Sequence, residues 1–210
     1  MHLSGFTPPF TLKWYNIECF RKWNIPDIVN INTHSLCRYG QGLKRQKNTM
    51  IREMNENDSQ RVLEIYKMGL DTKNATFETV VPSWSDWDLK HHKHSRFVYV
   101  DNNTILGWVA LTPVSSRKVY EGVAEVSVYI DTNFLHKGIG SGLMDKVILS
   151  SEEQGIWTLY SSVFSENIAT IKLHLKYGFR VIGKREKIAQ LDNKWHDTTI
   201  LERRSKKVGI

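Results

Sequence analysis

The stretch from Glu125 to Gly142 constrains the fold of this chain more than any other. β-Branched and aromatic residues alternate over residues 125–131, which predicts a strand. A glycine-rich turn follows, and apolar residues then recur at helical spacing (Ile139, Leu143, Met144, Val147 and Ile148). A strand, a glycine turn and a helix start form an anion cradle, because free backbone N–H groups and the positive end of the helix dipole point at the ligand. Such a cradle suits a diphosphate.

The glycine spacing distinguishes between kinds of diphosphate site. A dinucleotide fingerprint needs G-x-G-x-x-G, but here the third glycine, Gly142, comes one position early. A P-loop needs Gly-Lys-Ser/Thr after four intervening residues, and this turn lacks it. Coenzyme A is the remaining candidate.

The segment Leu135–Gly140 resembles the coenzyme A signature of the GNAT N-acetyltransferases, Gln/Arg-x-x-Gly-x-Gly/Ala. Leu135 stands where that family carries Gln or Arg, so one side-chain anchor is missing while the backbone amides remain. The resemblance implies that acetyl-CoA is the co-substrate. It also implies that the pyrophosphate lies on the turn and first helical residues, namely His136, Lys137, Gly138, Ile139, Gly140 and Ser141.

A second segment, residues 165–179, resembles the other signature of this superfamily, Asn-x-x-x-x-x-Leu-Tyr/His-x-x-x-Gly-Phe. Asn167 suits the start of a helix, and Gly178 suits a left-handed stop. Ile168, Ile171 and Leu175 make one helical face. Asn167 either holds the pantetheine arm or simply caps the helix.

Two further segments are similar to the phosphinothricin acetyltransferase branch. They are residues 74–78 and the run from Arg117 through Tyr120 to Tyr129. The resemblance, which covers about residues 50–202, implies transfer to the α-amine of phosphinothricin, methionine sulfoximine or a related small amino acid. It implies Phe77, Arg117 and Tyr120 as substrate-side residues. Glu121 replaces an arginine that the family often carries, which predicts weaker binding of a doubly anionic substrate.

Amide formation requires removal of a proton from the amine and a donor for the tetrahedral oxyanion. Glu125 begins the strand that leads into the cradle, so it is the candidate general base; the alternative is a carboxylate paired with a surface cation. His174 occupies the position of the usual tyrosine acid, or else is a packed histidine. Both cysteines precede residue 50, so direct transfer is favoured over a cysteine-linked intermediate in the folded region.

The strand that carries Glu125 also offers backbone groups to the co-substrate. Val128, Tyr129 and Ile130 are expected to pair with the pantetheine arm as though it were an added strand. The Val128 N–H is the candidate donor to the thioester oxygen.

The chain divides into two parts in this reading. Residues 1–49 show no sustained period, and we expect an extension with little fixed structure, or alternatively an interaction arm. Residues 50–210 predict one α/β domain with a mixed central sheet. The resemblance implies that this is the GNAT fold, in which helices flank the sheet. The expected strands lie near 50–54, 97–100, 105–111, 123–131, 156–163, 179–188 and 194–201, and the expected helices near 62–69, 83–94, 139–153 and 166–177.

Charge argues against a nucleic-acid partner. The chain carries +7, but residues 1–49 hold seven Lys/Arg against two acidic residues, so the remainder contributes only +2. The longest apolar run is far below membrane-spanning length, and the start lacks a secretory pattern, so we expect no membrane and a cytoplasmic protein. His91 and His94 would share a face of the 83–94 helix, but no further ligand follows at suitable spacing; we expect a solvated histidine face and no metal.

The sequence therefore predicts an acetyl-CoA-dependent N-acetyltransferase acting on a small amino acid. The alternatives are acetylation of a protein N-terminus or a polyamine, and a non-catalytic module that binds coenzyme A. The sequence leaves the acceptor amine and the oligomeric state open, a homodimer included.

Overall fold

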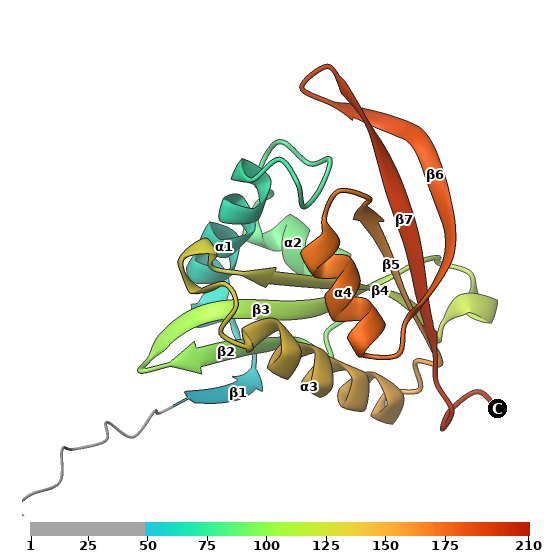
Figure 1. Cartoon of the computed structure of the whole chain (residues 1–210). Helices are drawn as coiled ribbons and strands as arrows, with labels where there is room; N and C mark the ends of the chain where they lie inside the picture. Colours follow the sequence, from blue (N-terminus) through green and yellow to red (C-terminus); the bar gives the residue numbers. More distant parts are fainter. Residues whose placement is uncertain (1–48) are drawn as a thin grey trace, which may run out of the picture. The chain divides into compact units, whose positions relative to one another are not determined.

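The computed structural model describes residues 49–210, so the expectation for the N-terminal extension lies outside the described residues except at Thr49. The described part contains a seven-stranded sheet in the order β1-β2-β3-β4-β5-β7-β6 (Figure 1). The strands are β1 (Thr49–Glu53), β2 (Phe97–Asp101), β3 (Thr104–Pro113), β4 (Val123–Ile130), β5 (Thr158–Phe164), β6 (Arg180–Leu191) and β7 (Lys194–Arg204). All neighbouring strands are antiparallel except β4 and β5, which are parallel.

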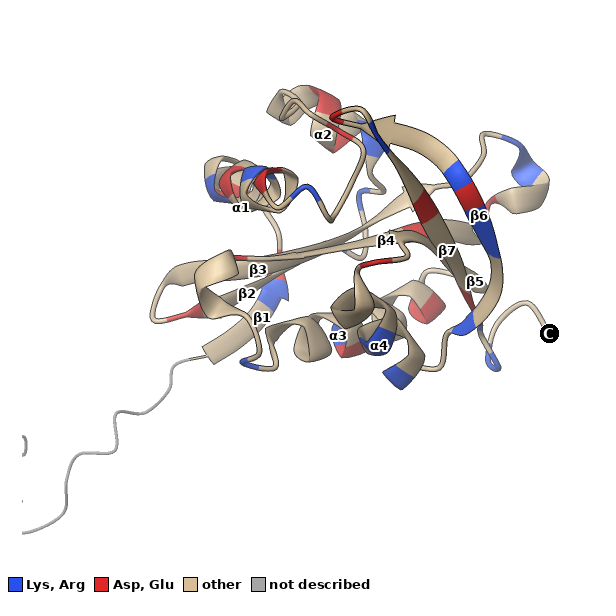
Figure 2. Ribbon diagram, turned by 45° about the horizontal axis from the view of Figure 1, so that its top comes forward, with Lys and Arg blue, Asp and Glu red and all other residues tan. Residues whose placement is uncertain are grey.

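Four α-helices cover the sheet: α1 (Ser59–Asp71), α2 (Trp84–Lys90), α3 (Ile139–Glu153) and α4 (Ile168–Lys176). Three short 3-10 helices lie in the connections: η1 (Glu56–Asp58), η2 (Lys118–Tyr120) and η3 (Thr132–Phe134). Figure 2 shows α1 and α2 on one side of the sheet and α3 and α4 on the other. The sheet is therefore mixed and flanked by helices on both faces, as the sequence predicts. None of the helices between residues 49 and 210 is long and apolar enough to cross a membrane.

Strand alternation divides the core into two clusters. Val109 and Leu111 on β3 face α3, where Leu143 and Val147 are fully buried. Trp108 and Ala110, the intervening residues of β3, pack in the other cluster with residues of α1 and α2. The clusters hold the two helix layers against opposite faces of β3 and β4.

Several local predictions agree with the structure. Helix α3 spans the predicted residues 139–153, and the turn of the β6–β7 hairpin is made by Asp192 and Asn193. Both turn residues have positive φ (49° and 63°), the conformation that a tight hairpin turn requires. Gly178 has φ of 81° and ends α4 as expected.

Two expectations about burial are wrong. Helix α2 ends at Lys90, and His91 turns inward as an extended residue that stacks on Trp87, so the 83–94 helix with a solvated histidine face does not form. On α4 the predicted apolar face is half exposed at Ile168 and Leu175, whereas His174 is buried. The side of α4 that faces the sheet presents Thr170 and His174 to a cavity rather than to an apolar core.

Candidate active site

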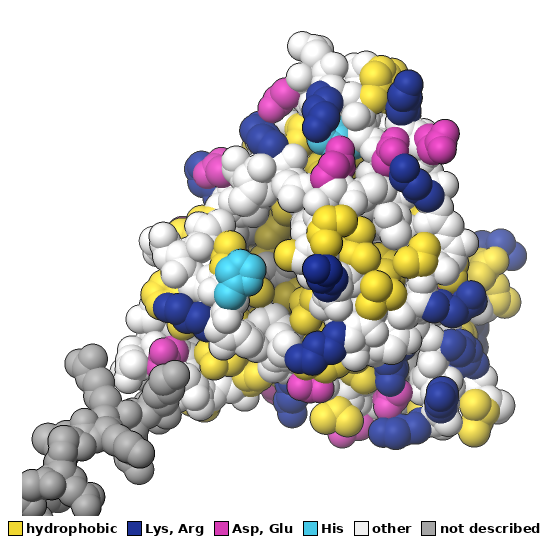
Figure 3. Space-filling model, viewed as in Figure 1, with side chains coloured by type: hydrophobic (Ala, Val, Ile, Leu, Met, Phe, Trp, Pro, Cys, Tyr) yellow, Lys and Arg dark blue, Asp and Glu magenta, His cyan; other side chains and the backbone are white. Residues whose placement is uncertain are grey.

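The central feature of the site is the separation of β4 from β5. The two strands pair only at residues 123–125 with residues 158–160, and no further pairing follows after Glu125. In Figure 1, β4 runs across the view while β5 rises beside β7, and α4 lies over the opening. A cavity of about 560 Å³ opens there, lined by residues of β4, β5, α4, α2 and the 75–82 loop. Figure 3 shows a hollow with hydrophobic walls in this face, beside the hydrophobic side chains gathered over α4.

The backbone of β4 presents alternate groups to this opening. Asp131 donates its N–H to the carbonyl oxygen of Leu106 on β3 (2.9 Å), which fixes the alternation of the antiparallel β3–β4 ladder. The N–H and C=O groups of Val128 and Ile130 therefore point away from β3 toward the opening. Those of Tyr129 point to β3, and the Tyr129 ring stacks on Trp108 (centroids 4.8 Å apart).

The glycine turn has the conformation that an anion cradle needs. Gly138 is the N-cap of α3 with φ of 81°, and no side chain caps the helix there. A Cβ atom at Gly138 would meet nothing within 4 Å, so the space beside the first helical turn is open to a ligand. A Cβ atom at Gly140 would instead approach Ile130 and Leu173 at 3.0 and 3.2 Å, so this glycine allows α3 to pack against β4 and α4.

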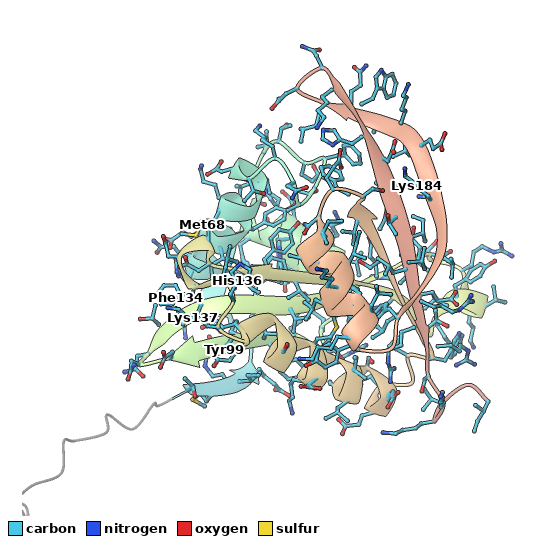
Figure 4. All side chains as sticks on the ribbon, viewed as in Figure 1. Met68, Tyr99, Phe134, His136, Lys137 and Lys184 are labelled. Carbon is cyan, nitrogen blue, oxygen red and sulfur yellow. The ribbon has the colours of Figure 1, made fainter. Side chains whose placement is uncertain are left out.

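The connection between β4 and α3, which includes the start of the cradle, adds a positive charge. Phe134, His136 and Lys137 lie together on the connection between β4 and α3 (Figure 4). The Lys137 ammonium lies 4.4 Å from the centre of the Phe134 ring, and His136 has a left-handed φ of 61°. Leu135, at the position of the family's Gln or Arg, is half exposed. The turn therefore fits a phosphorylated ligand through its backbone and one cation.

Glu125 lies at the point where β4 and β5 part, and its side chain lines the cavity. Burial raises the pKa of its carboxyl, while a hydrogen bond from the Ser162 backbone and the positive charges of Lys90 and Arg185 act in the opposite direction. A carboxylate with a raised pKa is a stronger base than an exposed one. Glu125 is thus a half-buried carboxyl with a raised pKa in the lining of the cavity, and its role as general base stays a prediction.

His174 is fully buried on α4 and also lines the cavity. Its Nδ1 lies 2.8 Å from the carbonyl oxygen of Thr170, so Nδ1 must carry the hydrogen. Within residues 49–210 its Nε2 has no hydrogen-bond partner, and burial lowers the pKa of the imidazole. At rest the ring is neutral with a free lone pair on Nε2, which suits a proton acceptor better than the acid expected from sequence.

Asn167 caps α4 and also reaches a distant loop. Its Oδ1 accepts a hydrogen bond from Thr170 N (3.1 Å), and its Nδ2 donates to the carbonyl oxygen of Asn74 (2.9 Å). The loop so held carries Phe77, which packs edge-on against Phe164 (centroids 4.5 Å apart) in the cavity wall. The side chain of Asn167 is therefore occupied within the protein, and the sequence did not reveal its hydrogen bond to the loop that carries Phe77.

A second hollow of about 450 Å³ also has Glu125 in its lining, together with Tyr160 and Arg185. Arg117 and Tyr120 line neither hollow. Both are exposed at η2, where Arg117 is the N-cap and Tyr120 the last residue, and the Arg117 guanidinium lies 5.4 Å from the centre of the Tyr120 ring. The structure does not group these two residues with Glu125, and their assignment to the substrate stays a prediction. Lys90 and Arg185, which the sequence did not single out, are the cations beside Glu125.

Comparison with known proteins identifies the family. The model of the acetyltransferase (GNAT) domain matches residues 51–200. The chain belongs to the GNAT acetyltransferase family. This match confirms the predicted family, fold and enzyme class. Several relatives of this acetyltransferase are named as phosphinothricin acetyltransferases, in agreement with the predicted resemblance to that branch.

Three of these relatives are informative. The Bacillus subtilis protein named "Putative phosphinothricin acetyltransferase YwnH" is 32% identical over 152 residues, which are 70% of this chain and 93% of the relative. The L-methionine sulfoximine/L-methionine sulfone acetyltransferase of Pseudomonas paraeruginosa is 28% identical over 98 residues, 47% of this chain and 57% of the relative. The crystal structure of a phosphinothricin acetyltransferase from Sinorhizobium meliloti in complex with acetyl-CoA matches at a TM-score of 0.71 and 21% identity, covering 77% and 90% of the two chains. This last likeness shows the fold.

Proposed function

We propose that this acetyltransferase moves an acetyl group from acetyl-CoA to the α-amine of a small amino acid of the phosphinothricin or methionine sulfoximine type. The observation that carries the proposal is the position of Glu125. A half-buried carboxylate with a raised pKa lies where β4 and β5 part, beside backbone groups that face the same opening. The names of the relatives supply the acceptor class.

In this proposal the acetyl-CoA diphosphate binds the residues that precede and begin α3, from His136 to Ser141. The pantetheine arm pairs with the outward backbone groups of Val128 and Ile130, beside Asn167. The open space beside Gly138 and the ladder alternation of β4 support this placement.

The reaction is a direct transfer. The amine nitrogen attacks the thioester carbonyl carbon, and Glu125 accepts the amine proton directly or through a water. The Val128 N–H donates to the oxyanion that forms, and the C–S bond then breaks to release the thiolate. His174, neutral with a free Nε2, is available as a second proton acceptor on the opposite wall and, once protonated, can return a proton to the thiolate. Among the described residues no group of three His, Cys, Asp or Glu side chains is arranged to bind a metal, and the steps above use none.

A screen of acceptors tests the function. Free amino acids, phosphinothricin, methionine sulfone, polyamines and short peptides are each mixed with acetyl-CoA, and thiol release is recorded. Acetylation of the amino-acid analogues with a kcat/KM well above that of peptides and polyamines is expected. A higher kcat/KM for a peptide or a polyamine would show that this compound, and not a small amino acid, is the acceptor. Coenzyme A binding without any turnover would indicate a non-catalytic module.

A further inference from the structure

Two cations from different elements, Lys90 at the end of α2 and Arg185 on β6, each line a hollow that Glu125 also lines. Their neighbours are engaged in ion pairs: Lys93 with Asp88, and Lys184 with Asp197 (2.8 Å). Within residues 49–210, Lys90 and Arg185 make no comparable hydrogen bond or ion pair. Each of the two shares a hollow with Glu125. Figure 2 shows the basic residues along β6.

The sheet explains how Lys90 comes close to Glu125. Lys90 is the last residue of α2, and two residues later His92 donates its N–H to the carbonyl oxygen of Leu111 (2.8 Å). The next residue of β3, Thr112, lies opposite Glu125 in the ladder. The end of α2 is therefore held over the start of the cavity.

Trp87, a neighbour of Lys90, adds a second hydrogen-bond donor. Trp87 lies one helical turn before Lys90, is 2% exposed and lines the same cavity. Within the described residues its indole N–H has no hydrogen-bond acceptor. A buried donor without a partner is costly, so an acceptor group on a ligand would satisfy it. Lys90 and Trp87 thus bring two polar donors to the α2 end of the cavity.

Arg185 approaches Glu125 from the opposite direction. It lies on β6 just before the pairing of β6 with β7 becomes irregular, and it lines the second hollow with Tyr160 and Glu125. A guanidinium presents a planar fork of donors that matches a carboxylate in two places. A Lys ammonium acts as a single point charge.

We propose that Arg185 binds the α-carboxylate of the acceptor amino acid, while Lys90 binds an oxygen-bearing or anionic group at the end of its side chain. The α-amine is attached to the carbon that joins these two parts of the acceptor, and it then lies at Glu125. This inference rests on the proposed function and narrows its acceptor to amino acids with a second polar terminus. It moves the carboxylate-binding role from Arg117, which lines neither hollow, to Arg185.

Three acceptors separate the two contacts. L-Phosphinothricin carries the α-carboxylate and an anionic side chain, L-methionine sulfone carries the carboxylate and a neutral sulfone, and 3-(methylsulfonyl)propylamine lacks the carboxylate. Arg185→Met is expected to raise KM about ten- to a hundredfold for both amino acids and leave the amine within about twofold. Lys90→Met is expected to raise KM for phosphinothricin about tenfold more than for methionine sulfone.

Two paired lysines supply matched controls. Lys184→Met on β6 and Lys93→Met beside α2 remove the same charge from neighbouring positions, and both should leave the KM ratios between acceptors unchanged. Equal KM changes for all three acceptors in the Arg185 and Lys90 variants would overturn the inference, since the cations would then act only on Glu125. A selective loss in Arg117→Ala, with none in Arg185→Met, would overturn it as well.

The activity of the wild-type enzyme distinguishes failure of this inference from failure of the proposed function. If it acetylates the two amino acids and the variants leave the KM ratios unchanged, only the assignment of Lys90 and Arg185 fails. If it acetylates none of the three acceptors, the proposed function fails, and the inference built on it fails too.

Discussion

Asn167 donates a hydrogen bond from its side-chain amide to the carbonyl oxygen of Asn74, joining α4 to a loop 93 residues earlier in the chain. The same side chain accepts a hydrogen bond from Thr170 N at the start of α4. One residue therefore both starts the helix that covers the cavity and holds the loop that carries Phe77.

Replacing Asn167 by serine separates these two roles. A serine hydroxyl can still cap α4, so the melting temperature should change little, but it is too short to reach Asn74. We expect KM for the acceptor to rise several-fold because Phe77 is no longer held. Asn167→Ala, which also loses the cap, should cost about 1 kcal/mol of folding stability in addition. An unchanged KM in the serine variant would show that the loop is held by other contacts.

Gly138→Val should weaken coenzyme A binding at least tenfold. A β-branched residue is strained at φ of 81°, and its side chain would fill the space beside the first turn of α3. Gly155→Val is a matched control, because Gly155 follows the other end of α3 with φ of 78° and equally open surroundings. Calorimetry with coenzyme A should show the loss only in the Gly138 variant. Equal affinities in the two variants would place the diphosphate elsewhere.

Glu125→Gln should lower kcat on the order of 10²–10⁴-fold, the usual effect of removing a general base, with acetyl-CoA affinity nearly unchanged. The loss should shrink at high pH, where more of the free amine is already neutral. A pH profile of kcat/KM for the wild type should fall on the acidic side at a pKa above that of an ordinary glutamate. Identical rates for variant and wild type at every pH would remove Glu125 from the mechanism.

The same variant has an expected effect on stability. The folded state raises the pKa of Glu125, so ionising this carboxyl at neutral pH costs folding free energy that the uncharged glutamine avoids. Glu125→Gln should therefore melt higher than the wild type at pH 7. The gain should diminish as pH falls toward the pKa of an unfolded glutamate, where the wild-type carboxyl is protonated in both states.

The burial of His91 predicts that the folding stability of the protein decreases in acid. Burial lowers its pKa to about 4, so the unfolded chain binds a proton between pH 6.5 and 4 that the folded chain does not. Stability should fall across this window, by about 3 kcal/mol from this residue at the acid end. His91→Asn keeps a donor for the Trp87 carbonyl oxygen but does not titrate. The melting temperature of this variant should be lower than that of the wild type at pH 7 and should depend less on pH. Parallel curves of melting temperature against pH for variant and wild type would show that His91 is not the source of the acid sensitivity.

A shortened chain that begins at Met50 should melt cooperatively and keep its activity. It retains the pairing of β1 with β2 except at Thr49, and it contains every residue to which a role is assigned above. Thermal denaturation and thiol release, compared with the full chain, check this. Insolubility or lost turnover would show that the domain needs residues 1–49.

Local signals in the sequence predicted the glycine turn and the helix that follows it well. A strand, a glycine turn and an apolar helical period are encoded within twenty residues, and α3 has the predicted bounds. Lys90 and Arg185, which line hollows together with Glu125, were not predicted, because they lie 95 positions apart in the chain and only the fold brings them near this carboxyl. The family resemblance implied Arg117 at the substrate; Arg117 is the exposed N-cap of η2 and lines neither hollow, so this role stays a prediction.

The three-residue contact between β4 and β5 has a consequence for the whole domain. Beyond it, the first four strands and the last three diverge, so the seven-stranded sheet is continuous only through residues 123–125 and 158–160. A pantetheine arm lying along β4 would act as an added strand in the gap. Filling the gap would then complete the sheet, so resistance to unfolding should rise with acetyl-CoA concentration. The co-substrate would then stabilise the folded enzyme as well as supply its acetyl group.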